Sequence, residues 1–141
     1  PKAIVALLAE YKINLSGVKV LVIGRGMTVG RPLSILLSQK PINATVTLAH
    51  SASKNLTELI KDADVVIAAM GSAHFIKAEM VKKGSVLVDV GITRDGNQLV
   101  GDFDPKVIEV ATAFAPMPGG VGPMTRVMLL KNVIDLARNE K

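Results

Sequence analysis

The chain has 141 residues, of which 49% are hydrophobic, and it carries a formal net charge of +5. This length suits one domain with a substantial core, so residues 1–141 are expected to form a single domain. Because the sequence contains no cysteine, disulfides and thiolate metal sites are excluded and a cytoplasmic location is expected. No apolar run approaches the ~18 residues of a membrane span, so we expect no membrane partner.

The positive charge favours a phosphorylated or polyanionic ligand. Nucleic acid is not expected as a partner, because lysine and arginine are dispersed and aromatic residues make up only 3% of the chain. The sequence enters a helical pattern directly at Pro1 with no capping residue before it, which suggests a piece of a longer protein. The high hydrophobic content then indicates apolar surface that faces a second domain or a subunit.

In chain order, apolar runs alternate with helical patterns. A first helix carries Ile4, Leu7, Leu8 and Tyr11 on one face, where Tyr11 is expected to pack. Strands are predicted at 18–23, 44–49, 65–69, 85–90 and 111–115. Helices are predicted from Val29, after Asn55, at 78–83, after Asp104, and from Gly122 to about 138. Asn55 is expected to be an N-cap with Glu58 as its capping partner, and Pro123 is expected at the first position of the last helix. Asp95-Gly96 predicts a small hairpin over 93–99. This alternation predicts an α/β fold, a Rossmann-like, doubly wound, mostly parallel sheet with helices on both faces.

The first strand ends in the glycine-rich turn Gly24-Arg-Gly-Met-Thr-Val-Gly30, which leads into a helix. A strand, a glycine turn and a helix are the context of a dinucleotide fingerprint. Gly24 permits a sharp turn, Gly26 permits close approach of a pyrophosphate, and Gly30 permits close helix packing. The spacing is one residue longer than G-x-G-x-x-G, so by itself it also fits a tight strand-to-helix turn of another parallel-sheet protein.

The composition after this turn favours NADP over NAD, with NAD still possible. An acidic residue about 20 positions after the fingerprint normally binds the ribose hydroxyl of NAD, but no Asp or Glu occurs between Tyr11 and Thr57. Arg25 and Ser51 offer donors that suit a 2′-phosphate. Arg25 as a solvated surface charge and Ser51 as a plain turn residue are the alternatives, and His50 is expected to orient its own loop.

No metal site is predicted. Asp89, at a strand end, and the pair Asp102 and Asp104 are interpreted as turn and cap residues, because carboxylates without a nearby histidine make poor metal ligation. His74 follows Gly71 in a loop and is interpreted as a solvated histidine.

A second unusual stretch is Ala115-Pro-Met-Pro-Gly-Gly-Val-Gly-Pro-Met-Thr125. Its prolines and glycines make a loop that is rigid at some points and unobstructed at others. The loop leaves the carboxyl end of the last predicted strand, the side of an open α/β sheet where ligands bind. We therefore interpret it as more than a plain connection.

Together, Gly24-Arg25-Gly26, Val29-Gly30 and Pro32, and then Pro116 to Thr125, closely resemble methylenetetrahydrofolate dehydrogenase/methenyltetrahydrofolate cyclohydrolase. The resemblance extends over essentially the whole chain and includes 88–92 and 101–104. It implies the carboxyl-terminal, NADP-binding domain of this bifunctional family. As implied by the resemblance, the cofactor-binding positions are Gly24, Arg25, Gly26, Gly30, Ser51 (2′-phosphate), Ile92 (nicotinamide end) and Thr93, and the folate-binding positions are Pro116, Pro118, Gly119, Gly120, Val121, Gly122 and Pro123.

The chain departs from the family pattern in several places. Members usually carry Ser where this chain has Gly26, which removes a phosphate donor, and Thr is common at the position of Ala115. The family's catalytic lysine and tyrosine, in a Y-x-x-x-K helix, belong to an amino-terminal domain. Here the single tyrosine is Tyr11 and the residue four later is Leu15, so no catalytic residue is assigned in this chain.

The resemblance implies oxidation of 5,10-methylenetetrahydrofolate by hydride transfer to NADP, followed in the full-length protein by hydrolysis to 10-formyltetrahydrofolate, within one-carbon metabolism and purine biosynthesis. The helices in 1–15 and 127–141 are expected to pack toward the absent domain, which shares the folate, and the fragment alone is expected to be inactive. A homodimer is expected, with the 93–99 hairpin as a possible contact. The alternatives are a non-catalytic nucleotide-binding module and a different two-domain dehydrogenase.

Overall fold

The computed structural model describes residues 1–139. A parallel five-stranded sheet has the order β2-β1-β3-β4-β7, formed by β1 (Lys19–Ile23), β2 (Thr45–Ala49), β3 (Val65–Ala68), β4 (Val86–Asp89) and β7 (Ala113–Ala115). The predicted doubly wound fold is thereby confirmed. Since β1 lies between β2 and β3, the strand order reverses at β1, and the switch point of the sheet is between β1 and β3.

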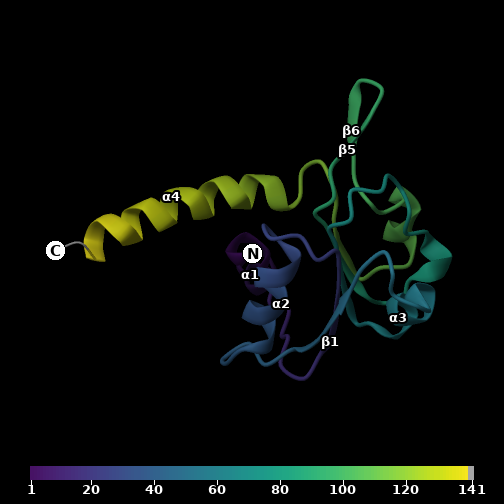
Figure 1. Cartoon of the computed structure of the whole chain (residues 1–141), viewed down its shortest axis with the longest axis horizontal. Coiled ribbons are helices and arrows are strands. Elements are labelled where there is room, and N and C mark those ends of the chain that lie inside the picture. Colours follow the sequence, from purple (N-terminus) through teal and green to yellow (C-terminus); the bar gives the residue numbers. More distant parts are fainter. Residues whose placement is uncertain (140–141) are drawn as a thin grey trace.

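Helices cover both faces of the sheet (Figure 1). One face carries α1 (Lys2–Glu10), α2 (Gly30–Ser38) and the start of α4 (Val121–Asn139), and the other carries α3 (Leu56–Asp62) with the 3-10 helices η1 (Ala78–Met80) and η2 (Pro105–Glu109). Side chains alternate along a strand, so Val20 and Val22 pack with the first group while Leu21 and Ile23 pack with the second. The nearly continuous apolar runs of β1 and β3 reflect this two-sided burial.

The predicted hairpin is also present. Its strands β5 (Thr93–Asp95) and β6 (Gln98–Val100) pair antiparallel and form a separate two-stranded sheet. In Figure 1 the hairpin projects from the carboxyl edge of the main sheet, away from the helices. The strands β5 and β6 therefore pair only with each other, and the outer edge of each strand is not paired with the main sheet.

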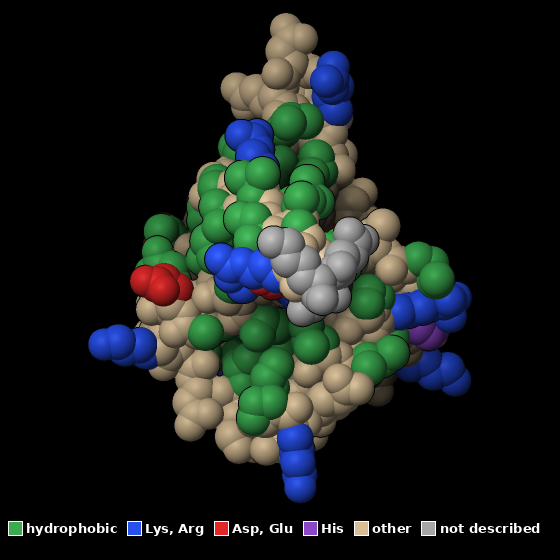
Figure 2. All heavy atoms as spheres, turned by 90° about the vertical axis from the view of Figure 1, so that its left-hand side faces the viewer, with side chains coloured by type: hydrophobic (Ala, Val, Ile, Leu, Met, Phe, Trp, Pro, Cys, Tyr) green, Lys and Arg blue, Asp and Glu red, His purple; other side chains and the backbone are tan. Residues whose placement is uncertain are grey.

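Helix α4 extends away from the body of the domain (Figure 1). Beyond its first turns its apolar side chains are exposed, and a hollow of about 540 Å³ lies between α1, α2 and α4. Figure 2 shows hydrophobic side chains gathered on this face. Its exposed apolar residues are Val127, Leu129, Leu130, Val133, Ile134 and Leu136. Within residues 1–139, no helix combines the length and apolar character that a bilayer crossing requires.

Three local predictions are corrected. Asn55 occupies the N-cap position of α3, but its backbone is left-handed (φ 55°) and its side chain makes no capping bond. Helix α4 begins at Val121, so Pro123 is its third residue, still within the first turn where a missing N–H is harmless. Tyr11 does not pack in the core: α1 ends at Glu10 and the Tyr11 side chain is 70% exposed.

Candidate functional site

The carboxyl ends of the parallel strands align along one edge of the sheet. Ile23 is in register with Ala49 and Ala68, Ala68 with Asp89, and Val88 with Ala115. The segments that follow these strands therefore leave the sheet side by side. They include the glycine turn after β1, the His50–Ser51 loop, the 90–93 segment and the proline–glycine loop. Neighbouring strands lie about 4.8 Å apart, so roughly 14 Å separates the turn after β1 from the loop after β7.

The glycine turn is tightly fitted on its inner side and open on its outer side. Gly24 has φ +114°, its N–H donates to the Ala49 carbonyl (2.9 Å), and an added Cβ would collide with the Ala69 carbonyl. A Cβ on Gly30 would collide with the Gly24 carbonyl, so α2 packs directly on the turn. By contrast, no heavy atom lies within 4 Å of the Cβ position of Gly26. The backbone at Gly26 is thus accessible to a ligand, as a pyrophosphate cradle requires.

The amino end of α2 adds electrostatic attraction for an anion. Its N-cap, Val29, supplies no side-chain cap, and its first turn contains no acidic residue. In this turn Pro32 has no N–H and the Arg31 N–H donates to the Gly26 carbonyl (3.1 Å), so the attraction comes from the Gly30 N–H and the positive end of the helix dipole. The residues around the turn therefore fit the phosphates of a dinucleotide.

Arg25 and Ser51 lie on neighbouring segments, after β1 and β2, and both are exposed. Within residues 1–139 the Arg25 guanidinium is in no ion pair. His50 orders the loop after β2. Its backbone N–H donates to Ser53 Oγ (2.9 Å), and its ring Nδ1 accepts from the Ala52 backbone N–H (3.2 Å). His50 orients its own loop as expected, and this order presents Ser51 beside the turn that carries Arg25.

Ile92 and Thr93 follow β4, two strands from the glycine turn. The Ile92 side chain is 62% exposed, whereas Thr93 opens the hairpin and its Oγ1 is buried without a hydrogen-bond partner in the described part of the chain. An exposed apolar side chain at this edge of the sheet is a suitable surface for an aromatic ring.

The proline–glycine loop leaves β7 and runs into α4. The Gly120 N–H donates to the Pro116 carbonyl (2.8 Å), Gly119 has φ +105°, and the Met117–Pro118 peptide is cis. Val121 is buried and anchors the loop in the core. Pro116, Pro118, Gly119, Gly122 and Pro123 are exposed, so the loop forms a rim at the same edge as the glycine turn.

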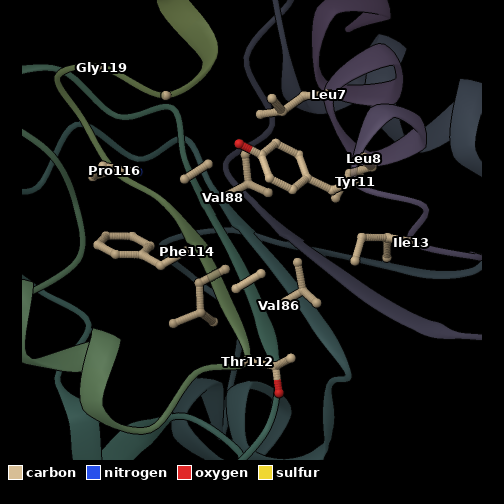
Figure 3. Close-up of a pocket in the computed structure, with 14 residues that line it drawn as sticks. Leu7, Leu8, Tyr11, Ile13, Val86, Val88, Thr112, Phe114, Pro116 and Gly119 are labelled. Atoms are coloured by element: carbon tan, nitrogen blue, oxygen red, sulfur yellow. The ribbon is translucent and has the colours of Figure 1, made fainter.

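Next to this rim lies an apolar cavity of about 410 Å³, on the side of the sheet that carries α1 (Figure 3). The Tyr11 ring stands over Val86 and Val88, and Phe114 and Thr112 line the β7 side (Figure 3). Sequence periodicity missed this arrangement, because Tyr11 was placed on the packing face of a helix that actually ends one residue earlier.

The acidic residues at this edge support the backbone. Asp104 caps η2 by accepting from the Lys106 N–H (3.0 Å) and also pairs with Lys77 Nζ (3.1 Å), while the carboxylates of Asp89 and Asp102 are buried and bind only backbone N–H groups. Burial raises the pKa of Asp89 to about 6. No cluster of three potential metal ligands occurs in residues 1–139. His74 is half-buried, and its backbone N–H donates to the Gly101 carbonyl (3.0 Å).

Residues 1–141 match the family described as tetrahydrofolate dehydrogenase/cyclohydrolase, NAD(P)-binding domain. Among solved structures, the chain is similar to the bifunctional enzyme FolD from Campylobacter jejuni, with 38% identity, a TM-score of 0.95, and coverage of 100% of this chain and 50% of that one. For the Trypanosoma brucei enzyme, complexed with NADP cofactor and inhibitor, these values are 34%, 0.90, 99% and 50%.

An NAD-dependent 5,10-methylenetetrahydrofolate dehydrogenase from Saccharomyces cerevisiae is 28% identical, with a TM-score of 0.78 and coverage of 99% of this chain and 51% of that one. The chain therefore spans about half the length of the solved relatives that it matches.

Proposed function

Because this chain belongs to the tetrahydrofolate dehydrogenase/cyclohydrolase family as its NAD(P)-binding domain, we propose that it holds NADP for an enzyme that oxidises 5,10-methylenetetrahydrofolate to 5,10-methenyltetrahydrofolate. In the full-length protein, water then opens the methenyl cation to 10-formyltetrahydrofolate, a step of one-carbon metabolism that serves purine biosynthesis. The observation that carries this proposal is the alignment of the open glycine turn and the proline–glycine rim along one edge of the sheet.

The dinucleotide is proposed to lie along this edge. Gly24, Gly26 and Gly30, with the amino end of α2, hold its phosphates. Arg25 and Ser51 bind the 2′-phosphate, which explains the lack of any acidic residue between Tyr11 and Thr57. Ile92 and Thr93 border the nicotinamide end. One relative is NAD-dependent, so membership of the family does not by itself decide between NADP and NAD. We propose that Arg25 and Ser51 make this choice in favour of NADP.

The folate is proposed to bind at the rim of Pro116, Pro118, Gly119, Gly120, Val121, Gly122 and Pro123. This loop follows β7, which neighbours β4, so it is adjacent to the segment that borders the nicotinamide. When bound, NADP would supply the hydride acceptor, the C4 carbon of its nicotinamide, and this chain would hold that carbon in near contact with the methylene carbon of the folate. This chain contributes position and electrostatics, and no catalytic residue is assigned to it.

The other half of the enzyme is proposed to pack on the apolar face of α4 and the adjoining outer side of α1. The exposed apolar side chains of α4 support this, as does the length of the relatives, about twice that of this chain. The inner side of α1, with Ile4 and Leu8, belongs to the core of this domain. The isolated chain is therefore expected to bind NADP weakly and to show no turnover.

We also propose that the enzyme is a cytoplasmic homodimer in which the projecting hairpin pairs with a second subunit. The free edges of β5 and β6 and the exposed side chain of Leu99 are suited to such a contact. The absence of cysteine from the chain fits a reducing compartment. No nucleic acid or membrane partner is proposed.

Titration of the 141-residue chain with NADP and with NAD tests the cofactor proposal. In Arg25→Ala, the dissociation constant for NADP is expected to rise ~10- to 100-fold, because a charge-assisted contact to phosphate is worth about 1.5–3 kcal/mol. The dissociation constant for NAD is expected to stay within twofold. Arg138→Ala, an exposed arginine in the last turn of α4, is the matched control and should change neither value. Equal weakening of both dinucleotides by Arg25→Ala would contradict the 2′-phosphate role.

A further inference from the structure

Asp102 is fully buried, and no cation pairs with it among the described residues. Its carboxylate instead accepts three backbone N–H groups from the segment that follows β3. The Met70 N–H donates to Oδ2 (2.7 Å), the Gly71 N–H also to Oδ2 (3.3 Å), and the Ser72 N–H to Oδ1 (2.7 Å). Only a carboxylate can accept all three, since the corresponding amide has a single acceptor oxygen.

Two glycines leave room for the carboxylates of Asp102 and Asp89. An added Cβ on Gly91 would collide with the Asp102 carboxyl group, and one on Gly101 would collide with the Asp89 carboxyl group. Asp89 in turn accepts from the Asp102 N–H (2.9 Å) and the Phe103 N–H (3.1 Å). Asp102 therefore links the segment after β3 to the segment after β4.

The held segment adjoins the glycine turn. Ala69, the residue before Met70, donates its N–H to the Ile23 carbonyl (2.8 Å) and has the carbonyl that excludes a Cβ at Gly24. Displacement of Met70 would thus move the peptide on which Gly24 rests. A continuous series of contacts joins Asp102 to the glycine turn at one end and to Gly91, beside Ile92, at the other.

We propose that Asp102 is a positioning residue for the cofactor: it holds residues 70–72 as the wall of the crevice at the β1/β3 switch point, and so sets the affinity for the dinucleotide. This inference rests on the proposed function. Asp102 touches no part of the cofactor and acts through backbone atoms that border it. An uncompensated carboxylate would be costly to bury, and the three N–H bonds stabilise it here.

The test compares Asp102→Asn with wild type in the 141-residue chain, by NADP titration and by amide hydrogen exchange. The dissociation constant for NADP is expected to rise about tenfold, which is the size of effect seen when a hydrogen-bonding group that only orients a binding residue is removed. Exchange at Met70 and Ser72 should accelerate at least as much while the β1 amides stay protected. Gly91→Ala, which displaces the carboxylate but keeps its charge, should produce the same two changes. Should Asp102→Asn not fold, Gly91→Ala decides the question.

Asp104→Asn is the matched control, because it removes the charge that pairs with Lys77 Nζ (3.1 Å), two residues from Asp102, without contacting residues 70–72. It should lower stability and leave the dissociation constant unchanged. A folded Asp102→Asn protein that binds NADP as wild type does would overturn the inference and leave the proposed function standing. A wild-type chain that binds neither NADP nor NAD would overturn the proposed function itself, and this inference with it.

Discussion

At the scale of single residues, Asp89 makes stability depend on pH. Its carboxylate is buried, accepts two backbone N–H groups and pairs with no cation in residues 1–139, and burial raises its pKa from 3.8 to about 6. The folded state therefore holds this proton more tightly than the unfolded state. The resulting stabilisation is complete below pH 4 and is lost as the pH rises to 6, and it amounts to about 3 kcal/mol.

Asp89→Asn is expected to remove this dependence. Relative to Asp89→Asn, wild type should lose unfolding free energy as the pH rises from 4 to 6. The difference between the two proteins should then stay constant to pH 8. Asp64 and Asp104, whose pKa values are lowered by hydrogen bonds to Lys82 and to the Lys106 N–H, act in the opposite direction but are present in both proteins. Urea unfolding at several pH values measures the difference, and a constant difference across this range would contradict the assignment.

At the scale of elements, Gly120, at the end of the proline–glycine loop, and Gly122, in the first turn of α4, have different surroundings. A Cβ on Gly120 would lie 2.5 Å from the Pro116 carbonyl oxygen, whereas a Cβ on Gly122 meets no heavy atom within 4 Å. Gly120→Ala is expected to cost about 1–3 kcal/mol of unfolding free energy by overpacking. Gly122→Ala should be neutral or stabilise by up to about 1 kcal/mol, since alanine is the better helix former. Chemical denaturation of both variants checks this contrast, and similar values would show that the loop relaxes freely.

Sequence patterns predicted the elements well and their ends less well. Strands such as 18–23 were recognised because continuous apolar runs bounded by glycine or proline have few other interpretations. The start of the helix after Asn55 was predicted correctly, but the capping bond was not, because the backbone at Asn55 adopts a left-handed conformation that leaves its side chain unused. The start of α4 was placed one residue late, at Gly122 instead of Val121. Candidate residues on the glycine turn and the rim were brought to one edge by the parallel register, which no local pattern encodes.

At the scale of the whole molecule, α4 has more apolar surface than this domain covers. The Leu130 side chain is 67% exposed, so Leu130→Gln is expected to change the unfolding free energy of the 141-residue chain by less than about 0.5 kcal/mol. In the longer protein of which we propose this chain forms half, the same change should cost more than about 1 kcal/mol, because the side chain would be buried.

Leu37→Ala is the reference for that comparison. Leu37 is fully buried between α2 and the sheet, so its truncation should cost about 2–5 kcal/mol in both the chain and the longer protein. Thermal or urea unfolding of these four variants and of the two unsubstituted proteins measures the effect. If Leu130→Gln were equally mild in the longer protein, the proposal that α4 packs on the other half would be wrong.

The sequence by itself determined the succession of strands and helices, the glycine turn, the acid-free stretch behind it and the family motifs, because each depends on residues that are close together in the chain. Only the tertiary structure decided that Asp102 holds residues 70–72, that the Ala69 carbonyl supports Gly24, and that Tyr11 stands over a cavity beside β7. These contacts join residues from 30 to slightly more than 100 positions apart. They arise from the order and register of parallel strands and from side-chain packing, which spacing along the chain does not specify.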